Sequence, residues 1–483
     1  MFSSADRRAD ADACPGALRL HSAADGPLAR IRLPGGRLTG AQLRALRELA
    51  EEFGDGQAEL TSRANLQLRA LTGPSPETLA SRLRAASLLP SDTHELVRNI
   101  LASPLPDCTA PLPVDLGKLL PQLDQALCAD PALAALPGRF LFALDSGALD
   151  VATQADVAAV PAPSLGGRPG EVAILFAGID AGLRVPADQT VPALLTAAHS
   201  FLAEQATQAA QVERADPATR ADPATPADPA TPTDPATPAS PATPTDPATP
   251  ASPAQPPVRS RPAEWAGDRA RAFGQAGFSR AWRVRELVDG PGRVAVRTAA
   301  ALGVVLGTGG AVPDTGRREL VGVLVQPGGL VAVGAAVPLG RLSGVQMRVV
   351  EEAAAIVVTP WRGVVLPGLT PPAAQQWARA LAGAGLEVHS GSRWAGVTAC
   401  AGQPGCAKSL ADVRTDASAA ARAGVGGLPV HWVGCARGCG SPAGPHVRVE
   451  ATGSGYTVRA PGSSGFATGV EVGELVAAAR SEG

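Results

Sequence analysis

A short motif that occurs twice constrains the fold of this chain more than any other feature. Gly36–Gln42 reads Gly-Arg-Leu-Thr-Gly-Ala-Gln and aligns with Gly340–Gln346, which reads Gly-Arg-Leu-Ser-Gly-Val-Gln. Both copies continue with apolar residues at helical spacing and then with an alternating strand, which carries Arg63 in the first copy and Arg362 in the second. The sequence therefore predicts a duplicated module with two similar halves.

Each copy also predicts its own local structure. Thr39 and Ser343 are the expected N-caps of the two helices. In the first copy, Glu59–Arg69 alternates and predicts one half-buried strand. Its apolar face would bury Leu60, Leu66 and Leu68. Its polar face would carry Arg63, Asn65, Gln67 and Arg69. Such a row suits a ligand with several carboxylates, and a solvated sheet edge is the alternative interpretation.

A segment of different composition separates the two halves. From Glu213 to Pro262 the chain repeats Asp-Pro-Ala-Thr-Pro and its Ser-Pro variants. Proline removes backbone donors, and few large apolar side chains are present to offset the entropy of ordering. We expect a disordered linker here, in preference to a proline-rich docking site. With 483 residues, the chain is also too long for a single core.

Charge and hydropathy exclude several classes of protein. The formal net charge is −2 and both signs are mixed along the chain, so no nucleic-acid partner is expected. The first residues lack the apolar stretch of a secretory signal. Leu320–Leu339 is interrupted by Gln326, Pro327 and two glycines, so it predicts strand and turn and not a membrane span. We expect a cytoplasmic protein, in which cysteines are reduced or bind metal.

Four cysteines near the C-terminus form the sharpest chemical signal. Cys400 and Cys406 have C-x5-C spacing, and Cys435 and Cys439 have C-x3-C spacing. Two glycine-rich loops that each offer two thiolates can surround a [4Fe–4S] cluster. The glycines let backbone N–H groups approach the sulfurs, and a helix over Lys408–Ala423 would point its positive end at the cluster.

Three other interpretations of these cysteines remain. A structural zinc site usually spaces paired ligands more closely than C-x5-C, buried unliganded cysteines rarely gather in glycine-rich loops, and disulfides do not suit the expected compartment. His431 is interpreted as a strand histidine with a local hydrogen bond. Cys14, Cys108 and Cys128 are scattered and are interpreted as small apolar residues.

These cysteine spacings, together with two halves of the Leu-Pro-Gly-Gly and Thr-Ser-Arg-Ala-Asn-Leu-Gln-Leu-Arg type, resemble the sulfite and nitrite reductases. Within that superfamily the chain most resembles the precorrin-3B synthases. The resemblance implies an α+β fold of pseudo-two-fold, duplicated nitrite/sulfite reductase-like architecture. In it, two ferredoxin-like halves form one unit and two α/β lobes flank them. The corresponding domains are 1–105 (half 1), 106–212 (lobe 1), 213–262 (linker), 263–385 (half 2) and 386–483 (cluster lobe).

The resemblance also assigns roles to arginines. Arg32 and Arg98 match the arginines that face the anionic substrate in the reductases, and Arg139 matches a lysine of the same site. The residues that match the tetrapyrrole-binding strand are Arg63, Asn65, Gln67 and Arg69.

Two positions depart from the reductase pattern. The second lysine of the reductase Lys-Phe-Lys motif is Leu141 here, which removes a cation and proton source for multi-electron reduction of sulfite or nitrite. The asparagine of the reductase Cys-Pro-Asn-x-Cys loop is replaced by Arg437. Both changes favour the synthases.

The implied reaction is an oxygen-dependent mono-oxygenation in aerobic cobalamin biosynthesis. Precorrin-3A would be hydroxylated at its C20 bridge with lactone formation, using a [4Fe–4S] cluster and an additional mononuclear non-haem iron. No dinucleotide-binding fingerprint is present, so electrons would come from a separate donor protein with NADH as the ultimate source. Two alternatives remain: a sirohaem-dependent nitrite or sulfite reductase, in which Cys439 would bridge cluster and haem, and a non-catalytic iron–sulfur tetrapyrrole sensor or carrier.

Overall fold

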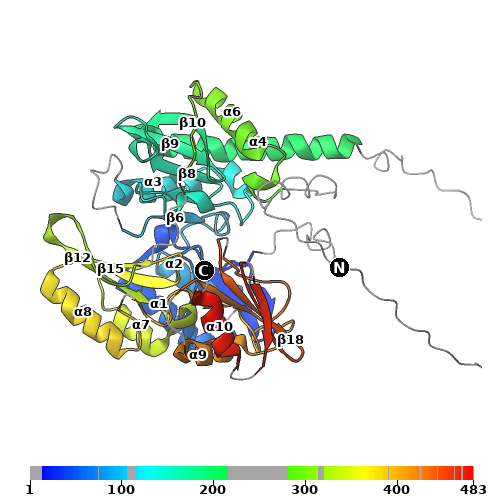
Figure 1. The fold of residues 1–483 in the computed structure, drawn as a ribbon. Coiled ribbons are helices and arrows are strands. Elements are labelled where there is room, and N and C mark those ends of the chain that lie inside the picture. The colour runs from blue at the N-terminus through cyan, green and yellow to red at the C-terminus, as the bar shows by residue number, and fades with distance from the viewer. Residues whose placement is uncertain are drawn as a thin grey trace, which may run out of the picture. The chain divides into compact units, whose positions relative to one another are not determined.

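The computed structural model describes most of the chain outside the linker. The described residues are 14–73, 75–105, 115–215, 281–313, 320–389, 391–423, 427–442, 444–461, 463–468 and 471–481. The predicted linker falls almost entirely outside them, as does Cys108. The sheets below all belong to one compact unit, which comprises Arg8–Gln208 and Arg280–Gly483. Figure 1 labels several of their strands and helices.

The first half of the duplicated module is a five-stranded sheet with two helices. The strands, in spatial order, are β1 (His21–Ala23), β2 (Gly26–Ile31), β5 (Leu66–Leu68), β4 (Gln57–Leu60) and β13 (Arg341–Ser343). The helices are α1 (Gly40–Phe53) and α2 (Pro76–Ala85). All neighbouring strands of this sheet are antiparallel.

The second half repeats this arrangement. Its strands, in spatial order, are β11 (Gly322–Val325), β12 (Val331–Ala336), β15 (Gly363–Leu369), β14 (Ile356–Val358) and β3 (Arg37–Leu38). Its helices are α7 (Gly344–Val350) and α8 (Pro371–Gly383). The strand and turn predicted for Leu320–Leu339 are therefore confirmed as β11, a turn and β12.

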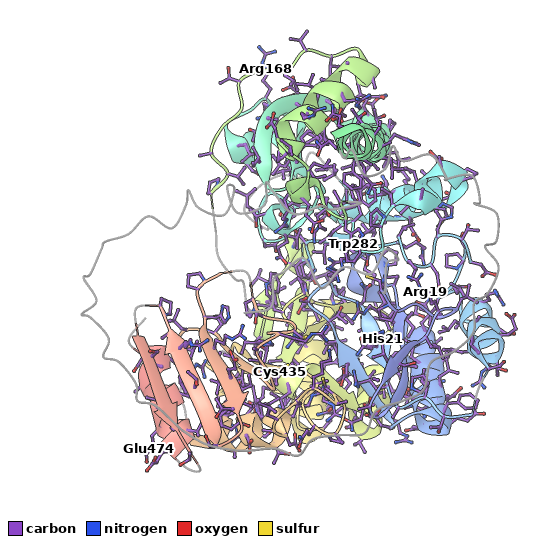
Figure 2. All side chains as sticks on the ribbon, turned by 90° about the vertical axis from the view of Figure 1, so that its right-hand side faces the viewer. Arg19, His21, Arg168, Trp282, Cys435 and Glu474 are labelled. Atoms are coloured by element: carbon purple, nitrogen blue, oxygen red, sulfur yellow. The ribbon has the colours of Figure 1, made fainter. Side chains whose placement is uncertain are left out.

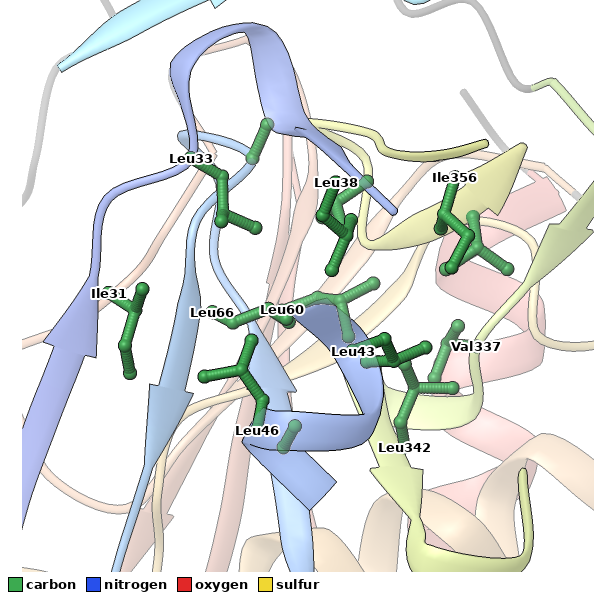
Figure 3. Packing of buried hydrophobic residues seen from close by; sticks show 14 of the residues in the cluster. Ile31, Leu33, Leu38, Leu43, Leu46, Leu60, Leu66, Val337, Leu342 and Ile356 are labelled. Carbon is green, nitrogen blue, oxygen red and sulfur yellow. The ribbon is translucent and has the colours of Figure 1, made fainter. Parts of the chain in front are cut away.

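The two halves exchange one strand each. Strand β13 of the second half pairs with β4 of the first, and β3 of the first half pairs with β14 of the second. Apolar residues of both halves consequently share one core, as Figure 3 shows for Leu38, Leu43 and Leu60 packed near Val337 and Leu342. Because each sheet is incomplete without a strand from the other half, the predicted single unit of two ferredoxin-like halves is confirmed.

Equivalent residues of the two copies share unusual backbone conformations. Gly36 and Gly340 both have φ of +68° before the helix. A side chain at Gly36 would meet the carbonyl oxygen of Val358, so glycine is required there. The predicted N-caps are confirmed, because Thr39 and Ser343 each form a capping box with the glutamine three residues later.

The single strand predicted over Glu59–Arg69 is wrong. The stretch is a hairpin in which β4 and β5 pair antiparallel. Its turn is closed by the Thr61 N–H, which donates to the Asn65 carbonyl, and by Ala64, whose φ is +55°. The second copy turns in the same way at Arg362, with φ of +61°. Arg63 therefore lies in a turn, whereas the predicted burial of Leu60, Leu66 and Leu68 is confirmed.

Lobe 1 is a mixed sheet with helices. Its strands, in spatial order, are β10 (Ile179–Pro186), β9 (Glu171–Phe176), β8 (Val157–Pro161), β7 (Phe142–Leu144) and β6 (Ile100–Ala102). The helices are α3 (Leu116–Ala129), α4 (Thr190–Ala215) and α6 (Gly290–Leu302). Helix α6, which the sequence assigned to half 2, packs against β9 and β10 of this lobe, and β6, assigned to half 1, is its edge strand.

The cluster lobe holds the four C-terminal cysteines. Its strands, in spatial order, are β16 (Val397–Ala399), β17 (Val430–Val433), β18 (Val447–Thr452), β19 (Gly455–Ala460) and β20 (Ser463–Ala467). Its helices are α9 (Val413–Ala423) and α10 (Glu471–Ser481). Over the part of the chain that the structure describes, no helix is long and apolar enough to cross a membrane.

Candidate functional site

Two neighbouring parallel strands of the cluster lobe place the two cysteine loops side by side. Cys400 directly follows β16, and Cys435 follows β17 after one glycine. The strands run parallel with Ala399 opposite Trp432, so their carboxyl ends meet at one edge of the sheet. The Gly434 N–H donates to the Sγ of Cys400 over 3.3 Å, as expected of a loop built to approach sulfur. Cys435 is labelled in Figure 2.

The four thiols lie close enough to influence one another. Burial raises the pKa of the Cys439 thiol, and Cys400, Cys435 and Cys406 raise it further by charge repulsion. Within the described residues, no three His, Cys, Asp or Glu side chains are grouped tightly enough for a single metal ion. A cubane cluster takes its thiolates at four separate irons, so the sulfurs need not converge on one point. Four cysteines on two adjacent loops are a donor set that fits a [4Fe–4S] cluster.

The additional mononuclear iron has no such support. Among the described residues, no group of three or more His, Cys, Asp or Glu side chains identifies its ligands. The mononuclear iron therefore stays a prediction.

The helix predicted from Lys408 begins later, at Val413. The residues before it are held by the second cysteine loop, because the Leu410 N–H donates to the Gly434 carbonyl over 2.8 Å. Asp412 then caps the helix by accepting from the Thr415 N–H. The start of α9 still lies beside the first cysteine loop, since the Nε of Arg414 donates to the Cys400 carbonyl over 3.1 Å.

His431 is a structural residue, as its strand position predicts. It is fully buried, and burial lowers its pKa to about 3, so the ring is neutral. Its Nδ1 lies 2.8 Å from the Thr398 hydroxyl, and its Nε2 lies 2.9 Å from the Cys439 carbonyl. A neutral ring with its proton on Nε2 donates to that carbonyl and fixes the second cysteine loop.

Replacing Gly434 by Ala should damage this site. A Cβ at Gly434 would lie 1.8 Å from the Ser409 Oγ and 3.2 Å from the Ser409 Cα. We expect a loss of about 1–3 kcal/mol in the free energy of unfolding from this overpacking. Thermal unfolding measures it, and Gly444→Ala is the control because no atom lies within 4 Å of that added Cβ. Equal melting temperatures for the two variants would contradict the packing argument.

A row of polar side chains crosses the first ferredoxin-like sheet. Arg30 pairs with Gln67, which pairs with Glu59, which pairs with Arg341, so the four lie on one face of neighbouring strands. The Nη2 of Arg30 donates to the Oε1 of Gln67 over 3.0 Å, and the Nε2 of Gln67 donates to the Oε2 of Glu59 over 3.1 Å. We call this the polar face.

The polar face contacts the first cysteine loop at one end. The Nη2 of Arg414, in the cluster lobe, lies 2.6 Å from the Oε1 of Glu59. Arg69 reaches the same loop, because its Nη2 donates to the Gly405 carbonyl over 2.9 Å. The sheet of half 1 is thus joined to the first cysteine loop.

Several guanidiniums gather toward lobe 1. We define the arginine cluster as Arg30, Arg32, Arg63, Arg139 and Arg283, whose charges act on one another. Burial, together with the Arg30 and Arg63 charges, lowers the pKa of Arg32 to about 9. Burial and the Arg283 charge lower the pKa of Arg63 to about 10. Like charges held together in partial burial are costly unless an anion neutralises them.

Arg32 gives the clearest indication of an anion-binding position. The side chain is buried, and its Nε and Nη1 have no hydrogen-bond partner among the described residues. Buried donors are normally satisfied, so an orphaned guanidinium indicates an anion-binding position. Arg32 lines a cavity of about 360 Å³ together with Arg37 and Arg98.

Other residues predicted for the site have partners within the protein. Arg98 is bound by Asp124 through two hydrogen bonds of 2.8 and 2.6 Å, and its remaining Nη1 donates to the Leu88 carbonyl. Arg69 makes two bonds of 2.9 Å to Asp25. The Oδ1 of Asn65 accepts from the Leu33 N–H over 2.8 Å. These contacts hold the scaffold, so the predicted substrate contacts of Arg98, Asn65 and Arg69 stay predictions.

Asp156 binds the segment that follows the linker and thereby brings Arg283 into the arginine cluster. Its two oxygens accept from the N–H groups of Leu141 and Val284, and it forms an ion pair of 2.5 Å with Arg283. Arg139 lies 4.4 Å above the ring of Trp282, which precedes Arg283. Figure 2 labels Trp282. The sequence reading missed Arg30 and Arg283, although the alternation of β2 places Arg30 on the same face as Arg32.

Comparisons with known proteins agree with this architecture. Residues 22–86 match the family model "Nitrite/Sulfite reductase ferredoxin-like half domain". The ferredoxin–nitrite reductase of Leptolyngbya laminosa is 33% identical over 142 residues, 28% of this chain and 28% of that protein. A precorrin-3B synthase of a Sinorhizobium species is 40% identical over 76 residues, 16% of this chain and 17% of that protein. The matched regions thus span less than a third of these curated relatives.

A solved structure extends the fold likeness to most of the chain. The structure of the Mycobacterium tuberculosis NirA protein superposes with a TM-score of 0.62 and 18% sequence identity, covering 91% of this chain and 76% of that one. The chain thus has an α+β fold that matches the fold of the NirA protein, and residues 22–86 carry the half-domain match. The curated relatives include both a nitrite reductase and a precorrin-3B synthase.

Proposed function

We propose that this protein is a precorrin-3B synthase. It would hydroxylate precorrin-3A at C20 while a ring A acetate closes a lactone. One atom of O₂ enters the substrate, and the other leaves as water with two electrons and two protons from a donor protein reduced by NADH. The observation that carries the proposal is the arginine cluster, whose orphaned Arg32 and mutually repelling neighbours suit a tetrapyrrole with many carboxylates.

The four cysteines would hold the cofactor. Cys400, Cys406, Cys435 and Cys439 are the proposed ligands of a [4Fe–4S] cluster, which supplies single electrons when bound. The chain's own contribution is to hold these thiols in place. The Gly434 N–H donates to the Cys400 sulfur, and His431 holds the Cys439 carbonyl.

Arginines would orient the substrate. Arg32 and Arg63 would neutralise carboxylates, and the stacked Trp282 limits where Arg139 can point. Fixing several carboxylates at once determines which bridge carbon faces the oxidant. Gln67 would complete the polar face beneath the tetrapyrrole.

Leu141 supports a synthase over an anion reductase. In the sulfite and nitrite reductases that the chain resembles, this position carries a lysine. Here the Leu141 side chain is buried in the shared core, and its N–H donates to Asp156. The site therefore lacks the second side-chain cation that would deliver protons to a reduced anion.

A sirohaem-dependent nitrite or sulfite reductase is the second candidate. The similarity to a ferredoxin–nitrite reductase favours it, and Arg32 could equally bind a small anion. In that case Cys439, the exposed member of the four, would bridge cluster and haem. A non-catalytic tetrapyrrole carrier is the third candidate.

One experiment separates the three candidates. Protein purified without oxygen is analysed for iron, acid-labile sulfide and extractable sirohaem, and is then incubated with precorrin-3A, reductant and O₂. A synthase contains the cluster without sirohaem and adds one oxygen atom to the substrate mass. Extractable sirohaem would favour the reductase, and binding of precorrin-3A without a mass change would favour the carrier.

A further inference from the structure

Two arginines hold both ends of the first cysteine loop. The Nε of Arg414 donates to the carbonyl of Cys400 over 3.1 Å, at the start of the loop. The Nη2 of Arg69 donates to the carbonyl of Gly405 over 2.9 Å, immediately before Cys406. Each proposed ligand of this loop therefore lies beside a carbonyl that is fixed by a guanidinium.

One carboxylate connects these two arginines. The Oε1 of Glu59 lies 2.6 Å from the Nη2 of Arg414 and 3.8 Å from the Nε of Arg69. The Oε2 of Glu59 accepts from Gln67, and Asp25 holds Arg69 from the other side. Glu59, Arg69 and Asp25 belong to the first ferredoxin-like half, whereas Arg414 and the loop belong to the cluster lobe.

We infer that Glu59, Arg69 and Arg414 form a brace that positions the Cys400–Cys406 loop for its cluster. The inference rests on the proposed cluster and gives Arg69 a positioning role in place of substrate binding. Fixing both loop ends removes conformational freedom that cluster binding would otherwise have to restrict. Hydrogen-bonded partners behind metal ligands typically change metal affinity about 10–100-fold when they are removed.

Arg341 supplies a matched control. Its Nε lies 3.7 Å from the Oε1 of the same Glu59, and its Nη2 lies 3.1 Å from Asp55. Among the described residues, the contacts of Arg341 are to Asp55 and Glu59 and not to the cysteine loop. Arg341→Gln thus removes one positive charge near the Glu59 carboxylate. The hydrogen bonds of Arg414 and Arg69 to the two loop carbonyls remain.

The test compares Arg414→Gln and Glu59→Gln with Arg341→Gln in the full-length protein. Iron and sulfide content and the rate of cluster bleaching by a chelator are measured without oxygen. We expect the first two variants to lose the cluster at least about tenfold faster than the wild type, and Arg341→Gln to match the wild type. Equal rates in all four proteins, or equally fast loss in Arg341→Gln, would overturn the brace.

A fourth variant separates geometry from charge. Arg414→Lys keeps the charge but cannot reach the Cys400 carbonyl and Glu59 at once, so it should lose the cluster as Arg414→Gln does. A lysine variant as stable as the wild type would refute the geometric role.

Hydrogen exchange of residues 400–406 in cluster-free protein tests the brace independently of the cofactor. Exchange should rise in Arg414→Gln and Glu59→Gln and stay at the wild-type level in Arg341→Gln. Unchanged exchange in the first two variants would refute the brace. Wild-type protein that binds no iron or sulfide would instead refute the proposed function, and the exchange result would still decide on the brace.

Discussion

Cys435→Ser protein, purified without oxygen, is expected to contain no [4Fe–4S] cluster. Cys435 follows β17, one residue after the Gly434 N–H that donates to the Cys400 sulfur. A serine hydroxyl is a poor substitute for a thiolate at iron, so one of the four irons would lose its cysteine ligand and the cluster its stability. Iron and acid-labile sulfide should fall from cluster stoichiometry to background, and the broad visible absorption should disappear.

Cys128→Ser is the control for this variant. Cys128 lies in α3 of lobe 1, on a different core from the cluster lobe, and should keep the wild-type iron content. If Cys435→Ser retained its full iron and sulfide, the assignment of the four cysteine ligands would be wrong.

The sequence predicted the duplicated architecture because the signals for it are local. A capping residue, a glutamine three positions later and an apolar helical stripe occur together in each copy, and each of them constrains only its own segment. The proximity of Cys400 and Cys435 could be predicted in the same way, since each follows a short apolar strand.

Three features could not be predicted from such local signals. The exchanged strands β3 and β13 have two and three residues, too few to show alternation. The hairpin turn at Ala64 uses a positive φ that its side chain does not favour, so Glu59–Arg69 resembles one strand. Arg283 reaches the arginine cluster only because Asp156 binds the segment after the linker, a contact between residues far apart in the sequence.

Arg69 also has partners that lie far from it in the sequence, and its predicted role in substrate binding stays a prediction. An arginine on the polar side of an alternating stretch indicates a ligand face when only the strand is considered. Its partners, Asp25 and Gly405, come from the start and the end of the chain. Which arginines bind a ligand is therefore decided by the carboxylates and carbonyls that tertiary contacts bring to them.

Arg32→Met should make the ligand-free protein more stable and its tetrapyrrole binding weaker. Burial without a partner and the nearby Arg30 charge lower the pKa of Arg32 to about 9. The Arg32 guanidinium thus holds its proton less tightly in the folded state than in the unfolded chain. The buried charge therefore lowers the free energy of unfolding by its full amount below about pH 9, and by less at higher pH. Methionine of similar length removes this cost, and we expect a gain of about 1–3 kcal/mol in the free energy of unfolding. The gain should be larger at about pH 7 than at about pH 10.

Arg98→Met is the matched comparison, because it makes the same substitution in an arginine that lines the same cavity. Arg98 is held by two bonds to Asp124, whose carboxylate would lose its partner, so this variant should lose about 1–3 kcal/mol. Without ligand, the melting temperatures of the two variants should therefore shift in opposite directions.

Titration should show that Arg32→Met binds the tetrapyrrole about 10–100-fold more weakly than the wild type, because one charge-assisted contact is lost. A lower melting temperature for Arg32→Met would mean that its guanidinium serves the fold, and the arginine cluster would no longer indicate a polyanionic ligand.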